Sequence, residues 1–212
     1  MSKPMTGTAE RVEQALRRRR TSAPEVNDSR NGAGRRERDA RAAASAARRL
    51  SERIVHEGLA DISYAPADSP FGSLLLAATK RGLARVAFPE EDVDEVLDRL
   101  ATRISPRIVE AAGPLEAMRR ELDEYFEGRR RRFELALDWT LVGPFARRVL
   151  GAASEIPYGG VLSYAQVAAQ AGSPRGSRAA GNALGANPIP IVVPCHRVLR
   201  RGGALGGYAG GL

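Results

Sequence analysis

The sequence has very little of what a secreted or membrane protein needs. Its 212 residues contain one cysteine, which excludes an internal disulfide framework and leaves a free thiol suited to a reducing, cytoplasmic compartment. No apolar run approaches the roughly 18 to 20 residues that span a bilayer, and no signal-peptide segment is recognisable near the start. One cysteine and two histidines cannot fill a tetrahedral metal shell without carboxylates, so we expect no metal ion.

Acidic residues are almost absent from residues 139–212, which contain seven Lys and Arg and one Glu. Residues 1–60 contain 14 basic and 8 acidic residues, and residues 61–138 contain 12 and 16. The C-terminal surface should therefore attract phosphate, whereas the middle of the chain should repel it. The eight acids at the start also exclude an organelle transit peptide. A merely solvated basic surface is the alternative, and for the N-terminal run alone it is the simpler account.

Composition and periodicity divide the first 138 residues into two parts. Residues 1–60 form a basic extension, in which the cluster RRRR and the polar stretch at 22–36 are typical of disorder and the Ala/Arg-rich segment predicts a helix over about 36–58. Residues 61–138 predict a small α+β domain. Its expected elements are a hairpin of SLLLAAT and LARVAF around Lys80–Gly82, helices within EEDVDEVLDRLA and GPLEAMRRELDEYFEG, and a returning strand in RRFELALDW.

Residues 139–212 predict a mainly helical domain. Pro144 lies near the start of an amphipathic helix. Ser163 is suited to cap the helix of LSYAQVAAQAG, which should end at Gly172, and SRAAGNALG forms a second short helix after the turn SPRG. Two short helices joined by a tight turn in a basic segment indicate a DNA-binding helix-turn-helix, although helix hairpins are also common in ordinary cores.

The second of these helices consists almost entirely of small residues, with Arg178 as its one long basic side chain. A helix that reads the major groove needs several long polar side chains to reach base edges. Small side chains instead permit close approach to the narrower minor groove. Tight packing against a neighbouring helix also selects Ala and Gly, and this alternative stays open.

The segment PIPIVVPCHRVLR, residues 188–200, places the only cysteine beside one of the two histidines. A thiol needs a base or positive surroundings to act as a nucleophile, and His196, Arg197, Arg200 and Arg201 supply positive charge. Adjacent side chains point to opposite faces of a strand, so Cys195 and His196 can meet only if the chain turns, and three prolines favour a turn. The alternative is a buried structural cysteine next to a surface histidine.

At this point the residues resemble a known family. The stretch IPYGGVLSYAQVAAQAGSPRGSRAAGNALGANPIPIVVPCHRVLRRGGALGGYAGG, and within it the sequence PCHRV, is similar to the active-site domain of the O6-alkylguanine-DNA alkyltransferases, or methylated-DNA–protein-cysteine methyltransferases. The segments DSPFGSLLLAATKRGLARVAFPEE and LDEYFEGRRRRFELALDW resemble the N-terminal domain of that family. The resemblance therefore runs from about residue 61 to the last residue, and residues 1–60 lie outside it.

The resemblance implies roles for the residues around the thiol. Cys195 would be the alkyl acceptor and would attack the carbon attached to guanine O6. His196, acting through a water, would be the base that forms the thiolate, and Asn187 would support the turn beside it. Tyr164 would donate a proton to the departing guanine and crowd the phosphate on its 3′ side.

A further group would hold the DNA and the flipped base, because a thiol cannot reach O6 inside a duplex. Arg178 would fill the vacancy in the base stack. Its small neighbours would dock in the minor groove: Ser177, Ala179 and Gly181. The base pocket would be lined by Pro190, Val198, Tyr208 and Ala209. The loop itself would be ordered by Pro194 and Arg197.

The resemblance also implies what the reaction needs. The donor is the lesion itself, so the reaction takes no cofactor, and the thioether product has no easy leaving group, so the protein would act once. We therefore expect an α+β, monomeric, cytoplasmic DNA-repair transferase whose partner is double-stranded DNA carrying O6-alkylguanine.

Two alternatives remain. In the family, GYxGGL leads into a closing helix whose glutamate orients the histidine, and the sequence ends at Leu212 before such a helix. A histidine without that carboxylate is a weaker base, so a lesion-binding or DNA-binding module with impaired or no transfer is an alternative function. An unrelated Cys-His acyl-transfer enzyme is disfavoured, because the segment contains no third member of a triad.

Overall fold

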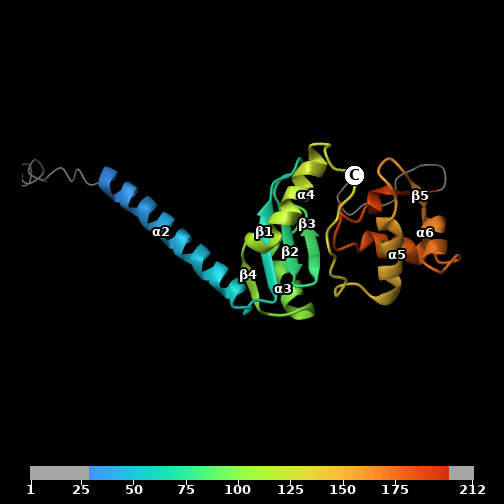
Figure 1. Cartoon of the computed structure of the whole chain (residues 1–212), viewed down its shortest axis with the longest axis horizontal. Coiled ribbons are helices and arrows are strands. Elements are labelled where there is room, and N and C mark those ends of the chain that lie inside the picture. The colour runs from blue at the N-terminus through green and yellow to red at the C-terminus, as the bar shows by residue number, and fades with distance from the viewer. Residues whose placement is uncertain (1–28, 201–212) are drawn as a thin grey trace, which may run out of the picture. The chain divides into compact units, whose positions relative to one another are not determined.

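The computed structural model describes residues 29–200, with side chains from residue 35 onward (Figure 1). The chain divides into two compact units, residues 1–47 and 48–212. The arginine cluster at 17–20 and the expected pocket residues Tyr208 and Ala209 lie outside the described residues. Within residues 29–200, no helix is both long and apolar enough to cross a membrane.

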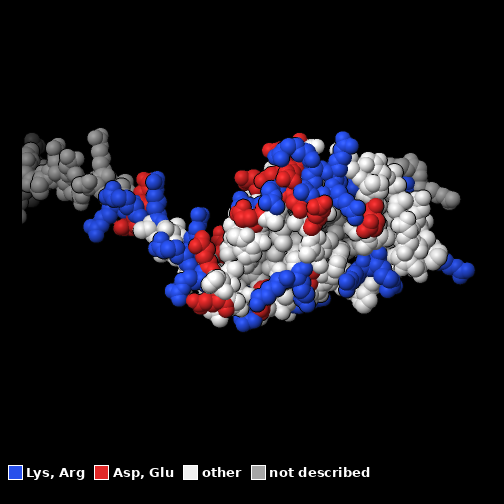
Figure 2. All heavy atoms as spheres, in the orientation of Figure 1, with Lys and Arg blue, Asp and Glu red and all other residues white. Residues whose placement is uncertain are grey.

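The first described element is a charged helix, α2, which spans Ser29–His56. It begins before the predicted start at residue 36, so the prediction of disorder is wrong for residues 29–36. The high helix propensity of the Ala/Arg-rich sequence outweighs Gly32 and Gly34. Exposed ion pairs of i, i+4 spacing join Arg35 to Asp39 and Arg41 to Glu37, each contributing about 0.3–0.5 kcal/mol. Figure 2 shows basic and acidic side chains interleaved along this helix.

Four strands form a mixed sheet in the order β3-β2-β1-β4. Their bounds are β1 Ile62–Ala67, β2 Leu74–Thr79, β3 Gly82–Ala87 and β4 Ile108–Glu110. β2 pairs with β1 and β3 in antiparallel fashion, and β1 pairs with β4 in parallel fashion. The predicted hairpin is therefore confirmed. It places β3 at one edge of the sheet.

Helices cover both faces of this sheet. α3 (Val93–Arg103) buries its apolar residues in one core cluster with Leu75 and Ala77 of β2. α4 (Glu116–Phe126), which follows the 3₁₀ turn η1 (Gly113–Leu115), shares the second cluster with Leu74 and Leu76. Because successive strand side chains point to opposite faces, this two-sided cover buries nearly the whole of β2. Both predicted helices are confirmed.

The hairpin turn requires a glycine. Gly82 has a φ of +130°, and a Cβ built there would lie 2.1 Å from the carbonyl oxygen of Ala136. No other residue type fits both the backbone angle and this close approach. The turn therefore lets the chain at Ala136 pass directly against the start of β3.

The predicted returning strand in RRFELALDW is wrong. This segment makes one isolated parallel bridge, between Leu83 and Leu137, with hydrogen bonds from Leu83 N to Ala136 O (2.9 Å) and from Asp138 N to Leu83 O (2.8 Å). Further along the same edge, the amide of Val86 donates to the carbonyl of Pro188 at 2.9 Å. The segment does not extend its pairing along β3, because the amide of Val86 is already bonded to Pro188.

Three helices make up most of the C-terminal part. α5 (Pro144–Ser154) begins at the predicted proline. α6 (Tyr164–Gln170) has Ser163 as its N-cap, in a reciprocal capping box with Gln166, and Gly172 follows its end with a φ of +78°. α7 (Ser177–Gly185) is the second short helix. The predicted helices are confirmed. Figure 1 shows α5 and α6 beyond the β3 edge of the sheet, away from β1 and β4.

One apolar core joins the sheet to these helices. The cluster that contains Leu74 and Leu76 also contains Val149 of α5 and Val167 of α6, all fully buried. Residues 189–195, which lead to the cysteine, contribute Ile189 and four further side chains to the same cluster: Ile191, Val192, Val193 and Cys195. The reactive thiol therefore sits at the edge of a core that spans both halves of residues 61–200.

Candidate active site

The backbone that leads to the cysteine is a series of tight turns. Ile191 has a φ of 72°, the one positive value of a non-glycine residue within the described chain, and the amide of Val192 donates to Pro190 O at 2.9 Å. Together these define a γ-turn of the rare, strained kind, at a cost of about 1–3 kcal/mol. Pro194 (φ −80°, ψ 63°) forms a second γ-turn, closed by Cys195 N to Val193 O at 2.8 Å.

A 3₁₀ turn, η2 (Cys195–Arg197), then carries the Cys-His pair, and the amide of Arg197 donates to Pro194 O at 2.9 Å. The turn that the three prolines favoured is therefore present. Cys195 and His196 do not lie on opposite faces of a strand, which removes the geometric objection to their acting together.

The side-chain amide of Asn187 ties this turn together. Its Nδ2 donates to Val193 O at 3.0 Å and to Cys195 Sγ at 3.3 Å. Its Oδ1 accepts a hydrogen bond from the amide of Ile189 at 3.0 Å. Asn187 is buried, so these bonds replace those that water would otherwise make. One residue thus fixes both the backbone before the cysteine and the position of the sulfur.

Burial decides the protonation of the two central groups. Cys195 is 9% exposed, and its burial raises the pKa of the thiol above 9.0 even though Asn187 and the amides of Cys195 and His196 donate hydrogen bonds that lower it. Burial and the nearby charge of Arg197 lower the pKa of His196 below 6.5. At neutral pH the thiol is therefore protonated and the imidazole is neutral, which is the pair of states that general-base activation requires.

Burial outweighs the hydrogen bonds that lower the pKa of the Cys195 thiol. The guanidinium of Arg197 bonds to Ile156 O and to the hydroxyl of Tyr125, and Arg201 lies outside the described residues. Activation of the thiol by the neighbouring arginines stays a prediction. Because the thiol is protonated at neutral pH, a base is needed to form the thiolate.

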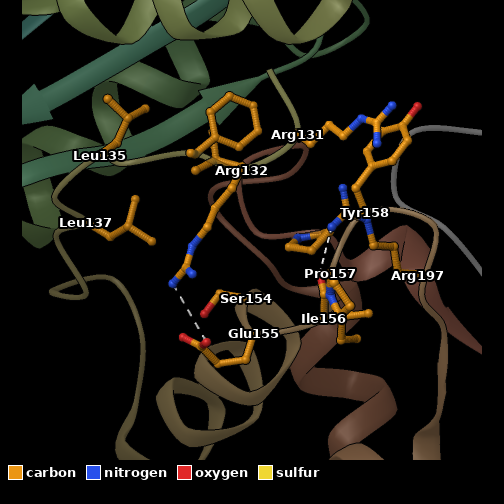
Figure 3. Close-up of a pocket in the computed structure, with 13 residues that line it drawn as sticks. Arg131, Arg132, Leu135, Leu137, Ser154, Glu155, Ile156, Pro157, Tyr158 and Arg197 are labelled. Carbon is orange, nitrogen blue, oxygen red and sulfur yellow. Dashed lines mark hydrogen bonds and ion pairs between the residues drawn. The ribbon is translucent and has the colours of Figure 1, made fainter. Parts of the chain in front are cut away.

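Arg197 lines a cavity of about 470 Å³ together with Tyr158 and Ile156 (Figure 3). Its Nη1 donates to Ile156 O at 2.7 Å, and its Nη2 donates to the hydroxyl of Tyr125 at 3.5 Å. Its guanidinium also lies 5.6 Å from the ring centre of Tyr158, and that of Arg131 lies 5.5 Å from the same ring. These contacts hold the C-terminal end of η2 to α4 and to the loop after α5, which is the geometry of a residue that orders the loop.

A short parallel pairing brings α6 to the reactive turn. β5 (Leu162–Ser163) pairs with β6 (Val198–Leu199), so the first residue of α6, Tyr164, follows directly from a strand that lies beside the end of η2. Tyr164 is half-buried against the core. Val198 and Pro190, two of the expected base-pocket residues, are both buried, and their role in a base pocket stays a prediction.

α7 has one buried and one exposed side. Ala180, Ala183 and Leu184 pack into the core, whereas Ser177, Arg178 and Ala179 are exposed. Gly181 faces Tyr164, because a Cβ at Gly181 would lie 3.6 Å from two carbon atoms of the tyrosine ring. The small residues therefore serve packing on one side and leave a low, open surface with a single long basic side chain on the other.

Within the part of the chain that the structure describes, no group of three or more His, Cys, Asp and Glu side chains is arranged to hold a metal ion. The turn η2 carries a thiol and an imidazole, the amide of Asn187 bonds to the sulfur, and the phenol of Tyr164 begins the helix that follows β5. These groups can activate a sulfur nucleophile and protonate a leaving group.

Comparison with known proteins assigns this arrangement to a family. Residues 144–212 match the family described as "6-O-methylguanine DNA methyltransferase, DNA binding domain", and residues 62–139 match "6-O-methylguanine DNA methyltransferase, ribonuclease-like domain". The constitutive methylated-DNA–protein-cysteine methyltransferase of Bacillus subtilis is 39% identical over 150 residues, which cover 69% of this chain and 86% of the relative. The chain belongs to the O6-methylguanine-DNA methyltransferase family.

Other members of the family support the same assignment. The methylated-DNA–protein-cysteine methyltransferase of Mycolicibacterium paratuberculosis is 41% identical over 152 residues, covering 71% of this chain and 86% of the relative. The crystal structure of Mycobacterium tuberculosis O6-methylguanine methyltransferase matches with a TM-score of 0.59 and 35% identity over 71% of this chain and 86% of that one. A structure described as Mycobacterium tuberculosis OGT in complex with DNA matches with a TM-score of 0.60 and 36% identity over 70% and 85% of the two chains. The predicted α+β fold and family are confirmed.

Three residues around this site are not predictable from the sequence near them: Arg85, Tyr125 and Tyr158. Tyr125 meets Arg197 across 72 positions of sequence, and Arg85 donates to Pro188 O across 103 positions. No local pattern connects such residues, because each belongs to an ordinary strand, helix or loop. For Tyr158 the sequence offers the GRRRR run at 128–132 as a hint of a nearby partner, since Arg131 within that run faces its ring.

Proposed function

We propose that this protein repairs O6-alkylguanine in DNA by irreversible transfer of the alkyl group to Cys195. The observation that carries the proposal is the placement of Cys195 Sγ, which is buried at the edge of the core and receives a hydrogen bond from Asn187. Family membership and the DNA complex of a relative support the same function. A thiol with so little exposure reacts only with a group that enters its pocket, and a base can do so only after it leaves the duplex.

The chemistry follows from the protonation states. Neutral His196, through a water, takes the proton from the Cys195 thiol, and the sulfur attacks the carbon attached to guanine O6. The S–C bond forms as the C–O6 bond breaks, and Tyr164 gives its hydroxyl proton to the departing guanine, to be reprotonated from solvent. The thioether carries no easy leaving group, so each molecule reacts once. The lesion supplies the alkyl group, and no cofactor enters the balance.

We propose that α7 is the element that docks on DNA. Its exposed small residues, Ser177 and Ala179 with the half-buried Gly181, allow the backbone to approach the minor groove closely. Arg178 projects from this surface and would occupy the gap left by the flipped nucleotide. Gly181 of this helix lies against the ring of Tyr164, so the proton donor packs directly on the docking helix.

Two alternatives are weaker. A module that only binds lesions would not need the buried thiol, the amide that holds it and a neutral histidine on the same turn. An acyl-transfer enzyme of the Cys-His type is disfavoured by the family match. We further propose that the protein acts as a monomer in the cytoplasm, where a single thiol stays reduced.

The test is mass spectrometry of the protein after it is mixed with duplex DNA that contains one O6-methylguanine. We expect one added methyl group, on the peptide that contains Cys195, with a matching loss of the lesion from the DNA. Duplex DNA with unmodified guanine is the control and should leave the peptide unchanged. Lesion binding without any added methyl would overturn the proposal and favour the binding module.

A further inference from the structure

The edge strand β3 forms hydrogen bonds with Pro188, the residue that directly follows Asn187. The carbonyl oxygen of Pro188 accepts two hydrogen bonds from this strand, one from the amide of Val86 at 2.9 Å and one from Nη1 of Arg85 at 3.3 Å. Proline has no N–H, so its carbonyl is the one backbone group through which this peptide can be held. Both bonds come from the sheet domain, and neither has a role in the function proposed above.

Arg85 is an unusual residue to find at this place. Its side chain is 13% exposed and forms an ion pair with Glu91, whose other oxygen accepts a hydrogen bond from the amide of Phe88 at 3.0 Å. Arg85 loses most of its hydration in this pair, while Glu91, whose side chain is 34% exposed, keeps part of its own, so desolvation of the guanidinium offsets much of the attraction. Stability alone therefore does not explain a guanidinium here. A directed hydrogen bond to one carbonyl does.

The path from Arg85 to the sulfur is short. Pro188 lies between Asn187 and Ile189, and the Asn187 Oδ1 bond to Ile189 N closes a tight turn around it. Fixing Pro188 O therefore fixes the plane of this turn and, with it, the direction of the Asn187 side chain. The same side chain holds Val193 O and Cys195 Sγ.

We propose that Arg85, anchored by Glu91, is a positioning residue for the alkyl transfer: it holds Pro188 so that Asn187 stays aimed at Cys195. This inference rests on the proposed function of Cys195. Arg85 acts through Pro188 and Asn187, and its own bonds go to Pro188 O and Glu91. Its effect is on the thiol alone, and it should be the same for every substrate.

The test compares three variants in the full chain. Arg85→Met with Glu91→Gln removes the bond to Pro188 without leaving the Glu91 carboxylate unpaired. Arg85→Lys keeps a charge and one donor. Arg81→Met is the matched control, because Arg81 lies on the same hairpin and pairs with the buried Asp138 at 3.2 Å but does not contact Pro188. Each is assayed with duplex DNA and with free O6-alkylguanine base, well below its melting temperature.

We expect the double variant to react about 10- to 100-fold more slowly with both substrates, as loss of a supporting hydrogen bond typically costs. The pH dependence of Cys195 modification by a small thiol reagent should also shift to higher pH, because a misaligned Asn187 stabilises the thiolate less. Arg85→Lys should recover most of the rate. Arg81→Met should lower the melting temperature without shifting this pH profile.

The inference is overturned if the double variant reacts within about twofold of the parent protein, or if its pH profile is unshifted and its rate falls no more than that of Arg81→Met. It is also overturned if only the duplex reaction slows, since Arg85 would then act through DNA. Should the double variant fail to fold, Glu91→Gln alone tests the same link with a smaller shift. A parent protein that takes no alkyl group refutes the proposed function instead, while the thiol reagent still reports on Arg85.

Discussion

The reactive segment, residues 187–198, and helix α2 contrast in how their residues are held. All but two residues of the segment are buried, its backbone takes a strained angle at Ile191, and its polar groups bond to defined partners such as Asn187 and Val193. Residues 35–50 of α2 are all exposed, and their ion pairs join residues of the same helix. The difference shows that chemistry at one atom requires a packed core, whereas display of charge requires only helix propensity.

Packing also offsets the strain in the reactive segment. The Ile191 turn costs about 1–3 kcal/mol by itself, while burial of an Ile or Val side chain contributes about 1.5–3 kcal/mol. Ile189, Ile191 and Val193 are all in the core that joins the sheet to the helices. Nothing comparable supports residues 35–50 of α2, where each exposed pair contributes a few tenths of a kcal/mol. Changes in the reactive segment should therefore have much larger effects than changes in α2.

The largest effect is expected for Cys195→Ser. A hydroxyl is nearly the size of a thiol but far less nucleophilic, so transfer should fall by more than about 1,000-fold while DNA affinity stays within a few-fold. Quantitative alkyl transfer and a DNA titration measure the two properties. For the parent protein, more than one alkyl group transferred per molecule would contradict the single-use mechanism.

Arg178→Ala should slow repair of duplex DNA by about 10- to 100-fold, because unstacking a base costs a few kcal/mol that the arginine no longer offsets. Reaction with free O6-alkylguanine base should change by less than about twofold, since nothing has to be flipped. Arg147→Ala removes an exposed arginine of α5, outside the docking helix, and is the control that should leave both rates near the parent values. Equal losses on both substrates would show that Arg178 serves the fold.

The pH dependence of the transfer rate tests whether His196 is the base that deprotonates Cys195. Its pKa is lowered below 6.5, so the rate should hold through pH 6.5 and fall about tenfold per pH unit only below the lowered value. His196→Gln should remove this acid limb. The rate of that variant should instead rise toward alkaline pH, because the unassisted thiol has a pKa above 9.0. An acid limb that survives the substitution would assign it to another group.

The same pKa shift of His196 affects stability. The unfolded chain binds a proton more readily than the folded one, so the stability present above about pH 6.5 should be lost as pH falls through the lowered pKa. Thermal melts of the parent protein and His196→Gln between pH 7 and 5 separate this contribution, which the variant should lack. A parallel decline of both melting temperatures would place the loss elsewhere.

The smallest effect is expected in α2. Arg35, Arg38 and Arg41 share one side of the helix, and all three are exposed. If this side binds DNA, changing the three to Gln should reduce the log-log slope of affinity against salt by about 0.9 for each phosphate that the arginines neutralise. Arg36→Gln, on the opposite side, is the control. An unchanged slope in the triple variant would mean that this side of the extension is a solvated surface and not a DNA arm.

Local sequence was sufficient to predict most of the elements but not how they meet. Ser163, Gly172 and Pro144 mark helix ends through bonds and angles within a few residues, and the structure has them there. The alternation in RRFELALDW also favours a strand, yet the segment forms only the bridge at Leu137. Whether a segment pairs as a strand depends on a free edge beside it. Here the edge of β3 beyond the bridge is occupied by Pro188, which accepts a hydrogen bond from Val86.

By itself the sequence determined the turn that carries Cys195 and His196, and it predicted their roles as nucleophile and base, because PCHR and three nearby prolines act over short range. Only the tertiary structure decided the state of that thiol. Burial raises its pKa, Asn187 reaches it through a turn closed by Ile189, and Arg85 meets Pro188 from 103 residues away. Such effects depend on which atoms become neighbours after the core has formed, and these neighbours cannot be predicted from positions along the sequence.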